Sequence, residues 1–124
     1  MQFAQWVFRV AGIWGLLILP PLYFLEQQIG RDQPPAITHP EFFYGFAGIG
    51  LAWQLAFLVI SLDPPRYRLL MLPSMIEKFS FSGAVIVLFA LGRVALPMLA
   101  AGVFDGTLGI LFVAAYFVCP RLSS

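Results

Sequence analysis

Long apolar stretches separated by short polar segments dominate this chain. The clearest stretch runs from Phe42 to Leu62 (FFYGFAGIGLAWQLAFLVISL) and holds 21 consecutive residues without a charge. Because a helix rises about 1.5 Å per residue, roughly 20 apolar residues cross a hydrocarbon core of about 30 Å. This stretch therefore predicts a membrane-spanning helix, and the other apolar stretches predict three more.

Prolines and polar residues mark the expected ends of these helices. Pro20 and Pro21 predict a kink or an early stop in the first helix, since proline removes a backbone hydrogen bond. Asp63 ends the second, because a residue before a proline avoids the helical region. Thr38 and Ser74 each stand three residues before a glutamate, a capping-box pattern that predicts a helix start. The four expected helices cover about residues 3–25, 41–62, 75–92 and 96–118.

The expected fold class is all-α: one transmembrane domain over residues 1–124, an integral membrane four-helix bundle. An outer loop is expected at 26–40 and a cytoplasmic loop at 63–74. Lys and Arg favour the cytoplasmic side of a membrane protein. One side holds five of them and the other two, so both termini are expected in the cytoplasm. The five are Arg9, Arg66, Arg68, Lys78 and Arg121, and the two are Arg31 and Arg93.

Composition agrees with a membrane protein and excludes several functions. Hydrophobic residues make up 60% and charged residues 10% of the chain, against about 45–50% and 25% in soluble domains. A net charge of +1 with seven Lys and Arg is too weakly basic for nucleic acid. With one cysteine, Cys119, and one histidine, His39, a single chain forms no disulfide, histidine-cluster metal site or bis-histidine haem. We expect no metal and no cofactor.

Asp105 is the most informative polar residue, because it lies about eight positions inside the fourth helix, roughly 12 Å from its boundary. An acid at that depth costs about 2.5–3.5 kcal/mol, so it must face protein or water. Gly102, Gly106 and Gly109 form a small-residue stripe beside it, which favours close helix packing. Asp105 is either a site for a ligand, proton or cation, or a hydrogen-bonded acid that joins two helices.

Other polar residues have both a functional and a structural explanation. Gln54, beside Trp53 in the second helix, could contact a ligand or hydrogen-bond another helix. At the outer end of the same helix, His39 and Glu41 could handle protons near Tyr44. Capping by Glu41 and anchoring by Tyr44 in the headgroup zone are the favoured explanation.

A charged cluster is expected on the cytoplasmic side. There, Glu77 would cap the third helix and Lys78 would extend its charge to the nearby interface. The cluster could also bind a lipid headgroup or a protein partner. Its members are Asp63, Arg66, Arg68, Glu77 and Lys78.

Most of the chain resembles uncharacterised bacterial four-helix membrane proteins. The resemblance rests on an HPEF entry to the second helix, a WQ pair, a DPPRYR turn and an EK pair. It implies the four-helix topology and a place in the bacterial inner (plasma) membrane, and it brings no activity. By architecture the chain is also similar to DoxX-like proteins and to small four-helix families that bind sterols or quinones.

Three function hypotheses follow. The first is a membrane protein that binds a lipid-like or other hydrophobic small molecule, or that packs as an accessory subunit of a membrane complex. The second is a small oligomeric transporter or channel that uses Asp105. The third is a membrane enzyme for an apolar substrate, with Asp105, Glu41 and His39 as acid and base. Beyond these three no catalytic residue is assigned, and a protein without enzymatic activity is favoured. The expected partners are the lipid bilayer, a hydrophobic ligand, and further copies of the chain or a larger complex.

Overall fold

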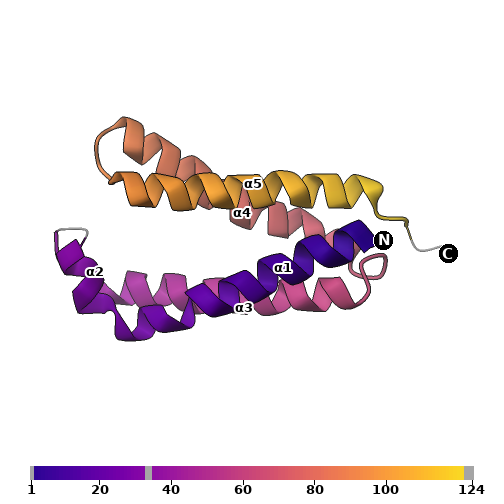
Figure 1. Ribbon diagram of the computed structural model, residues 1–124, viewed down its shortest axis with the longest axis horizontal. Helices are drawn as coiled ribbons and strands as arrows, with labels where there is room; N and C mark the ends of the chain where they lie inside the picture. Colours follow the sequence, from indigo (N-terminus) through magenta and orange to yellow (C-terminus); the bar gives the residue numbers. More distant parts are fainter. Residues whose placement is uncertain (1, 33–34, 122–124) are drawn as a thin grey trace.

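Helices account for most of the backbone that the computed structural model describes, residues 2–32 and 35–121 (Figure 1). Within those residues there is no strand, which confirms the all-α fold class. Three short helices lie in or beside the connections. The elements are α1 (Gln2–Ile18), η1 (Pro20–Phe24), α2 (Glu26–Asp32), α3 (Pro40–Leu62), η2 (Arg68–Leu70), α4 (Met71–Ala90) and α5 (Leu96–Val118).

Four helical stretches are long and apolar enough to cross a membrane. Each contains 23 residues, which at 1.5 Å per residue covers about 35 Å. The chain is therefore a multi-pass membrane protein with four candidate spans. They are Gln2–Phe24, Pro40–Leu62, Arg68–Ala90 and Leu96–Val118.

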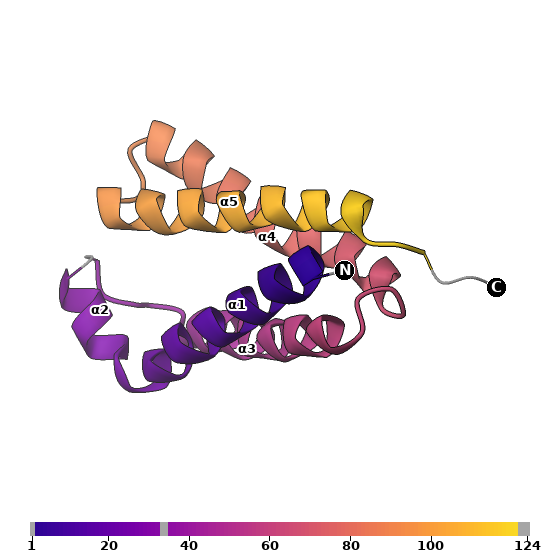
Figure 2. The same cartoon turned by 45° about the vertical axis from the view of Figure 1, so that its right-hand side comes forward.

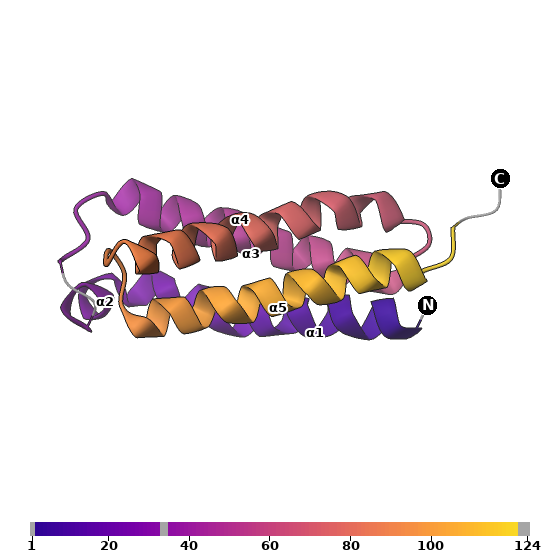
Figure 3. The ribbon, with the colours of Figure 1, turned by 90° about the horizontal axis from the view of Figure 1, so that it is seen from above.

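The four spans are arranged as two antiparallel pairs, α1 with α3 and α4 with α5 (Figures 1 and 3). The pairs are joined mainly through α1 and α5, whereas α3 and α4 touch little. Figure 2 shows that α1 begins and α5 ends at the same end of the bundle, where the pairs come closest. We call this the termini end, and the opposite one the α2 end.

An aromatic core holds the pairs together toward the termini end. Phe8 of α1 stacks on Phe112 of α5 with ring centroids 4.2 Å apart, and Phe57 of α3 meets Phe112 edge-on at 5.0 Å. All three rings are fully buried, as is Met71 at the start of α4. Aromatic pairs of this kind contribute about 0.5–1.5 kcal/mol beyond their buried area.

The first span changes its helix type at the two prolines. The α-helix α1 ends at Ile18, and the chain continues as the 3-10 helix η1 from Pro20. Neither proline can donate a backbone hydrogen bond, which explains the early stop. The polar segment that follows contains a short helix, α2, where the sequence predicted only a loop.

The predicted start of the third span is wrong. Helix α4 begins at Met71, not near Met75, and it ends at Ala90. Ser74 lies inside the helix, where its Oγ donates to the carbonyl oxygen of Leu70 at 2.7 Å instead of capping a helix end. Pro73 falls in the first turn, whose N–H groups have no partner within the helix, so it does not interrupt α4.

The capping prediction for the second span is also wrong. The N-cap residue of α3 is His39, which makes no capping hydrogen bond with its side chain, and the helix begins at Pro40. Proline suits this first position because its fixed backbone angle matches a helix. The helix end at Leu62 and both ends of α5 lie where the sequence predicted them.

Candidate functional site

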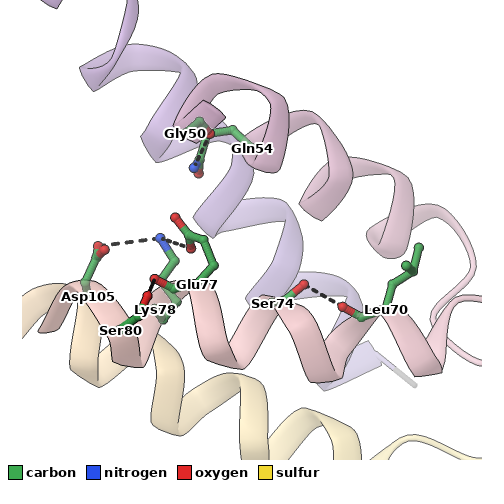
Figure 4. Close-up of polar contacts among 8 residues, drawn as sticks. All are labelled: Gly50, Gln54, Leu70, Ser74, Glu77, Lys78, Ser80 and Asp105. Atoms are coloured by element: carbon green, nitrogen blue, oxygen red, sulfur yellow. Dashed lines mark hydrogen bonds and ion pairs between the residues drawn. The ribbon is translucent and has the colours of Figure 1, made fainter. Parts of the chain in front are cut away.

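A buried lysine between two carboxylates is the main polar feature inside the bundle. Lys78 of α4 is only 4% exposed. Its Nζ lies 3.5 Å from Oδ1 of Asp105 on α5 and 3.5 Å from Oε2 of the neighbouring Glu77 (Figure 4). We call Glu77, Lys78 and Asp105 the charged centre.

The charged centre lies near the middle of the membrane-spanning region. Lys78 is separated from the ends of its span, Arg68 and Ala90, by 10 and 12 residues. Asp105 is 9 residues from Leu96 and 13 from Val118. At 1.5 Å per residue, both side chains start at least about 13 Å from either end of their span.

This depth corrects the sequence-based placement of Lys78. We expected it near an interface, and we expected Glu77 and Lys78 to share a cytoplasmic cluster with Asp63, Arg66 and Arg68. The structure instead divides that set: Asp63 and the two arginines lie at the termini end, while Glu77 and Lys78 lie inside the bundle. The earlier start of α4 is the reason, since it adds four residues before Lys78.

Helix α3 supplies the neutral side of the site. The Nζ of Lys78 lies 5.2 Å from the ring centroid of Phe57, and Gln54 lies one turn away on the same face of α3. Figure 4 shows the Gln54 amide projecting from α3 in the direction of Glu77. Gln54 is 3% exposed, and its Nε2 donates to the carbonyl oxygen of Gly50 at 2.8 Å.

Two acceptor atoms at this site lack a hydrogen bond. They are Oε1 of Gln54 and Oε2 of Glu77, and both are fully buried. Oε2 of Glu77 is within ion-pair distance of Lys78, but the two atoms are not aligned for a hydrogen bond. An unpaired buried acceptor costs about 1–3 kcal/mol, so the site has a free capacity to bind a donor.

The charges of the centre do not balance. Two carboxylates share one ammonium group, and within residues 2–32 and 35–121 no other cation lies in ion-pair contact with either carboxylate. The fully ionised centre therefore has a formal charge of −1. An excess charge is expensive in a low-dielectric interior. A bound cation would neutralise it.

The glycine stripe positions Asp105 by letting α5 approach α4 closely. A Cβ atom on Gly102 would lie 2.7 Å from Cγ1 of Val85, and one on Gly106 would lie 2.6 Å from Oγ of Ser82. Gly109 faces Phe79 in the same way. The stripe thus packs against a helix of its own chain.

Two further glycines, in α1, make a helix contact that was not predicted from the sequence. Gly12 and Gly15 bring α1 against α3: a Cβ on Gly15 would overlap the side chain of Gln54, and one on Gly12 would lie 2.8 Å from Cγ of Leu58. Their spacing of three residues places them on one helix face. That spacing, opposite a buried glutamine, is the signal that could have revealed this contact.

The remaining predicted residues do not join the charged centre. His39 and Glu41 form an exposed pair, 3.4 Å apart, at the α2 end of α3. Tyr44 stacks with Tyr23 of η1 at 5.7 Å, and Trp53 packs against the aromatic core. Since Glu41 precedes Gln54 by 13 residues of helix, about 20 Å separates them. His39, Glu41 and Asp105 therefore do not form one acid-base set.

Two surface pockets lie at opposite ends of the bundle. One of about 450 Å3 at the termini end is lined by Pro65, Arg66, Arg68, Leu69, Tyr116 and Arg121. The other, of about 360 Å3, lies beside α2 and is lined by Glu26, Gln27, Gly30, Arg31, Ala36 and Ile37. Neither contains a residue of the charged centre.

The described residues contain no group of three His, Cys, Asp or Glu side chains that could hold a metal ion. Comparisons with protein-family models, with curated proteins and with solved structures find no match for this chain. The resemblance to bacterial four-helix proteins therefore stays a prediction.

Proposed function

We propose that this chain is a small multi-pass protein of the bacterial inner membrane that binds a proton or another monovalent cation at its charged centre. Both termini lie in the cytoplasm, and binding serves transport across the membrane by an oligomer of the chain. The observation that carries the proposal is the burial of Lys78 between two carboxylates near the middle of its span.

Charge balance supports a cation as the ligand. With Glu77, Lys78 and Asp105 all ionised, one negative charge remains uncompensated in a region where solvation is weak. Binding one monovalent cation makes the centre neutral. Ionisable residues inside membrane spans mark proton relays and ion pathways for this reason.

The space at the site favours the proton. Two pockets, of about 450 and about 360 Å3, lie at the bundle ends and include no residue of the charged centre, and a bulky ligand needs a cavity of comparable size. A proton needs none. Once bound to Glu77 or Asp105, it turns that carboxyl into a hydrogen-bond donor, and Oε1 of Gln54 on the facing helix is a free acceptor.

Transport requires more than one chain. A conduction path is lined by several polar groups, whereas each chain contributes one charged centre. Copies of the bundle packed side by side would bring several centres together. Exposed apolar side chains on all four spans, including Leu17, Ile49, Ile76 and Ile110, are compatible with such packing.

Proton flux into proteoliposomes tests the proposal. The wild-type chain should acidify the lumen, reported by an enclosed pH dye, when a potassium gradient with valinomycin drives entry. Asp105→Asn removes the excess negative charge and keeps the Glu77–Lys78 pair, so it should lower flux at least about tenfold. Glu41→Gln, which removes an exposed carboxylate at the α2 end, is the matched control.

Two outcomes contradict the proposal: wild-type flux equal to that of empty liposomes, and flux unchanged in Asp105→Asn. Sodium and potassium fluxes measured on the same liposomes identify the cation. Orientation is tested separately with Gln27→Cys in a Cys119→Ala background. An impermeant maleimide should label this cysteine from outside intact cells, and absence of labelling would overturn the cytoplasmic termini.

A second candidate function is binding of a lipid-like molecule that carries a hydrogen-bond donor. Two aromatic contacts near the centre favour it, because each links the two helix pairs: Trp14 with Phe104 at 5.1 Å, and Phe46 with Phe81 at 5.8 Å. Trp14, Phe104 and Phe46 are each more than 40% exposed. An apolar body could lie among these rings, with its donor at the unpaired oxygen of Gln54.

Native mass spectrometry of the purified protein tests this candidate. A retained small molecule that is lost in Gln54→Leu and kept in Glu41→Gln would support it, and an unliganded wild-type protein would reject it. Packing as an accessory subunit predicts a larger complex on native electrophoresis of solubilised membranes. The enzyme hypothesis has the least support, because His39 and Glu41 lie far from Asp105.

A further inference from the structure

Three arginines gather around the pocket at the termini end. Arg66 and Arg68 come from the connection between α3 and α4, and Arg121 follows the end of α5. The pocket has a volume of about 450 Å3, enough for a phosphate group and the atoms bonded to it. Segments distant in sequence thus place three positive charges around one depression.

Arg68 is held in place by the C-terminal part of α5. Its Nε donates to the carbonyl oxygen of Tyr116 at 3.1 Å, and its Cζ lies 3.7 Å from the centroid of the Tyr116 ring. A guanidinium stacked on an aromatic ring keeps its outer N–H groups available for a planar, two-point contact. Because Arg68 is already ordered, less side-chain entropy is lost when an anion binds.

The described part of the chain does not neutralise these arginines. Its ion pairs join His39 to Glu41, and Lys78 to Glu77 and Asp105, and none includes an arginine. The nearest acid in sequence, Asp63, precedes the pocket segment and forms no ion pair with it. The pocket therefore has the chemistry of an anion site.

The surroundings indicate an anion attached to apolar chains. Leu69, which lines the pocket, is 73% exposed, and Phe117, next to Tyr116, is 75% exposed. Both belong to candidate membrane spans, at the end where headgroups and acyl chains meet. Arginine beside aromatic and aliphatic side chains suits a phospholipid, whose phosphate and chains are contacted together.

We infer that this arginine pocket is a binding site for the phosphate of an anionic phospholipid. The phosphate lies among Arg66, Arg68 and Arg121, and the acyl chains extend along Leu69 and Phe117. The site is independent of the charged centre, since Arg68 and Lys78 are separated by 10 residues of helix, or about 15 Å.

The test measures lipid binding by native mass spectrometry and thermal stability in nanodiscs. Wild-type protein should retain phosphatidylglycerol over phosphatidylcholine, and its Tm should be higher in nanodiscs that contain phosphatidylglycerol. Arg66→Gln/Arg121→Gln removes two charges and leaves the Arg68–Tyr116 contact intact. It should weaken phosphatidylglycerol binding by roughly tenfold or more, since each arginine near an anionic surface contributes to binding.

Arg31→Gln/Arg93→Gln is the matched control, because it removes the same charge away from the arginine pocket. Equal loss in both double variants would overturn the site in favour of general charge attraction. No preference for phosphatidylglycerol in the wild type would also overturn it. Inorganic phosphate added to phosphatidylcholine nanodiscs distinguishes the source: we expect no rise in Tm, and a rise equal to that with phosphatidylglycerol would assign the pocket to free phosphate.

Discussion

Glycines allow close packing in both the α1–α3 and the α4–α5 contact, but the two contacts bury very different polar groups. In each pair, glycines on one helix admit side chains of the other: Gly15 faces Gln54, and Gly102 faces Val85. In α3 the buried polar group is an amide that bonds to its own helix, at the carbonyl oxygen of Gly50. In α4 it is the ammonium of Lys78, whose partners include a residue of another helix.

The difference shows when a buried polar residue in a membrane bundle is structural and when it is a candidate site. The Gln54 amide nitrogen is satisfied within its own helix and carries no charge, so it needs space beside Gly15 but no partner of opposite charge. Lys78 contacts two carboxylates, one of them on another helix, and the second leaves an excess negative charge. We therefore expect the stability of the α4–α5 contact to depend on charge and that of the α1–α3 contact to depend mainly on shape.

The largest effect is expected for Lys78→Met, which leaves the partly buried carboxylates of Glu77 and Asp105 without a counter-charge. Breaking a buried ion pair in this way costs about 3–5 kcal/mol, and we expect a loss of this size in unfolding measured by denaturant titration in detergent micelles. The triple variant Lys78→Met/Glu77→Gln/Asp105→Asn should recover most of it. If Lys78→Met were as stable as the wild type, the two carboxylates would not need Lys78 as a counter-charge.

Next in size is Gly102→Ala, because its new Cβ would lie 2.7 Å from the β-branched Val85. Overpacking of this kind costs about 1–3 kcal/mol, measurable as a lower Tm in the same micelles. Gly83→Ala on the facing helix is the matched control, since no atom beyond its chain neighbours and its own helix backbone lies within 4 Å of its new Cβ. Equal effects at the two positions would argue against the α4–α5 packing.

A smaller effect is expected for Gln54→Met. The variant removes one hydrogen bond within α3, which lowers stability, and one unpaired buried acceptor, which raises it. Because these two effects partly cancel, the free energy of unfolding should change by less than about 1 kcal/mol. The free energies of unfolding of Gln54→Met and Lys78→Met, measured by denaturant titration in the same micelles, compare the α1–α3 contact with the α4–α5 contact. If Gln54→Met cost as much as Lys78→Met, the α1–α3 contact would depend on polarity as strongly as α4–α5.

The smallest effect is expected for Ser74→Ala. Its hydroxyl bonds to the carbonyl oxygen of Leu70 from inside α4, an arrangement that adds little to helix stability. We expect a change below about 0.5 kcal/mol in denaturant unfolding. Removing a true N-cap costs about 1 kcal/mol, and a loss of that size would favour a helix start at Ser74.

The sequence predicts the four spans well because their signals are local. Prolines after Asp63, near Leu96 and after Val118 limit the helices whatever surrounds them, and the charge-free stretch of α3 is long enough to cross a membrane by itself. The fold class follows from these features. The short helix α2 was missed because its polar, glycine-containing sequence has the composition of a loop.

The charged centre could not be predicted as a whole, because it depends on which helices meet. The pattern Ser74 to Glu77 indicates a helix start, but the same residues fit within a helix that begins at Met71. That shift of four residues moves Lys78 from the membrane surface to its interior. The depth of Asp105 was available from the sequence; its partner on α4 was not, since pairing across helices requires the three-dimensional packing.

The most direct test of the charged centre is a double-mutant cycle between Lys78→Met and Asp105→Asn, with free energies of unfolding measured in detergent micelles. Each single variant removes one side of a contact between two helices whose charged atoms lie 3.5 Å apart. We predict a coupling energy of about 2 kcal/mol, within the range found for residues in direct contact. Additive effects, with a coupling below about 0.5 kcal/mol, would show that the two residues act independently and would contradict the account.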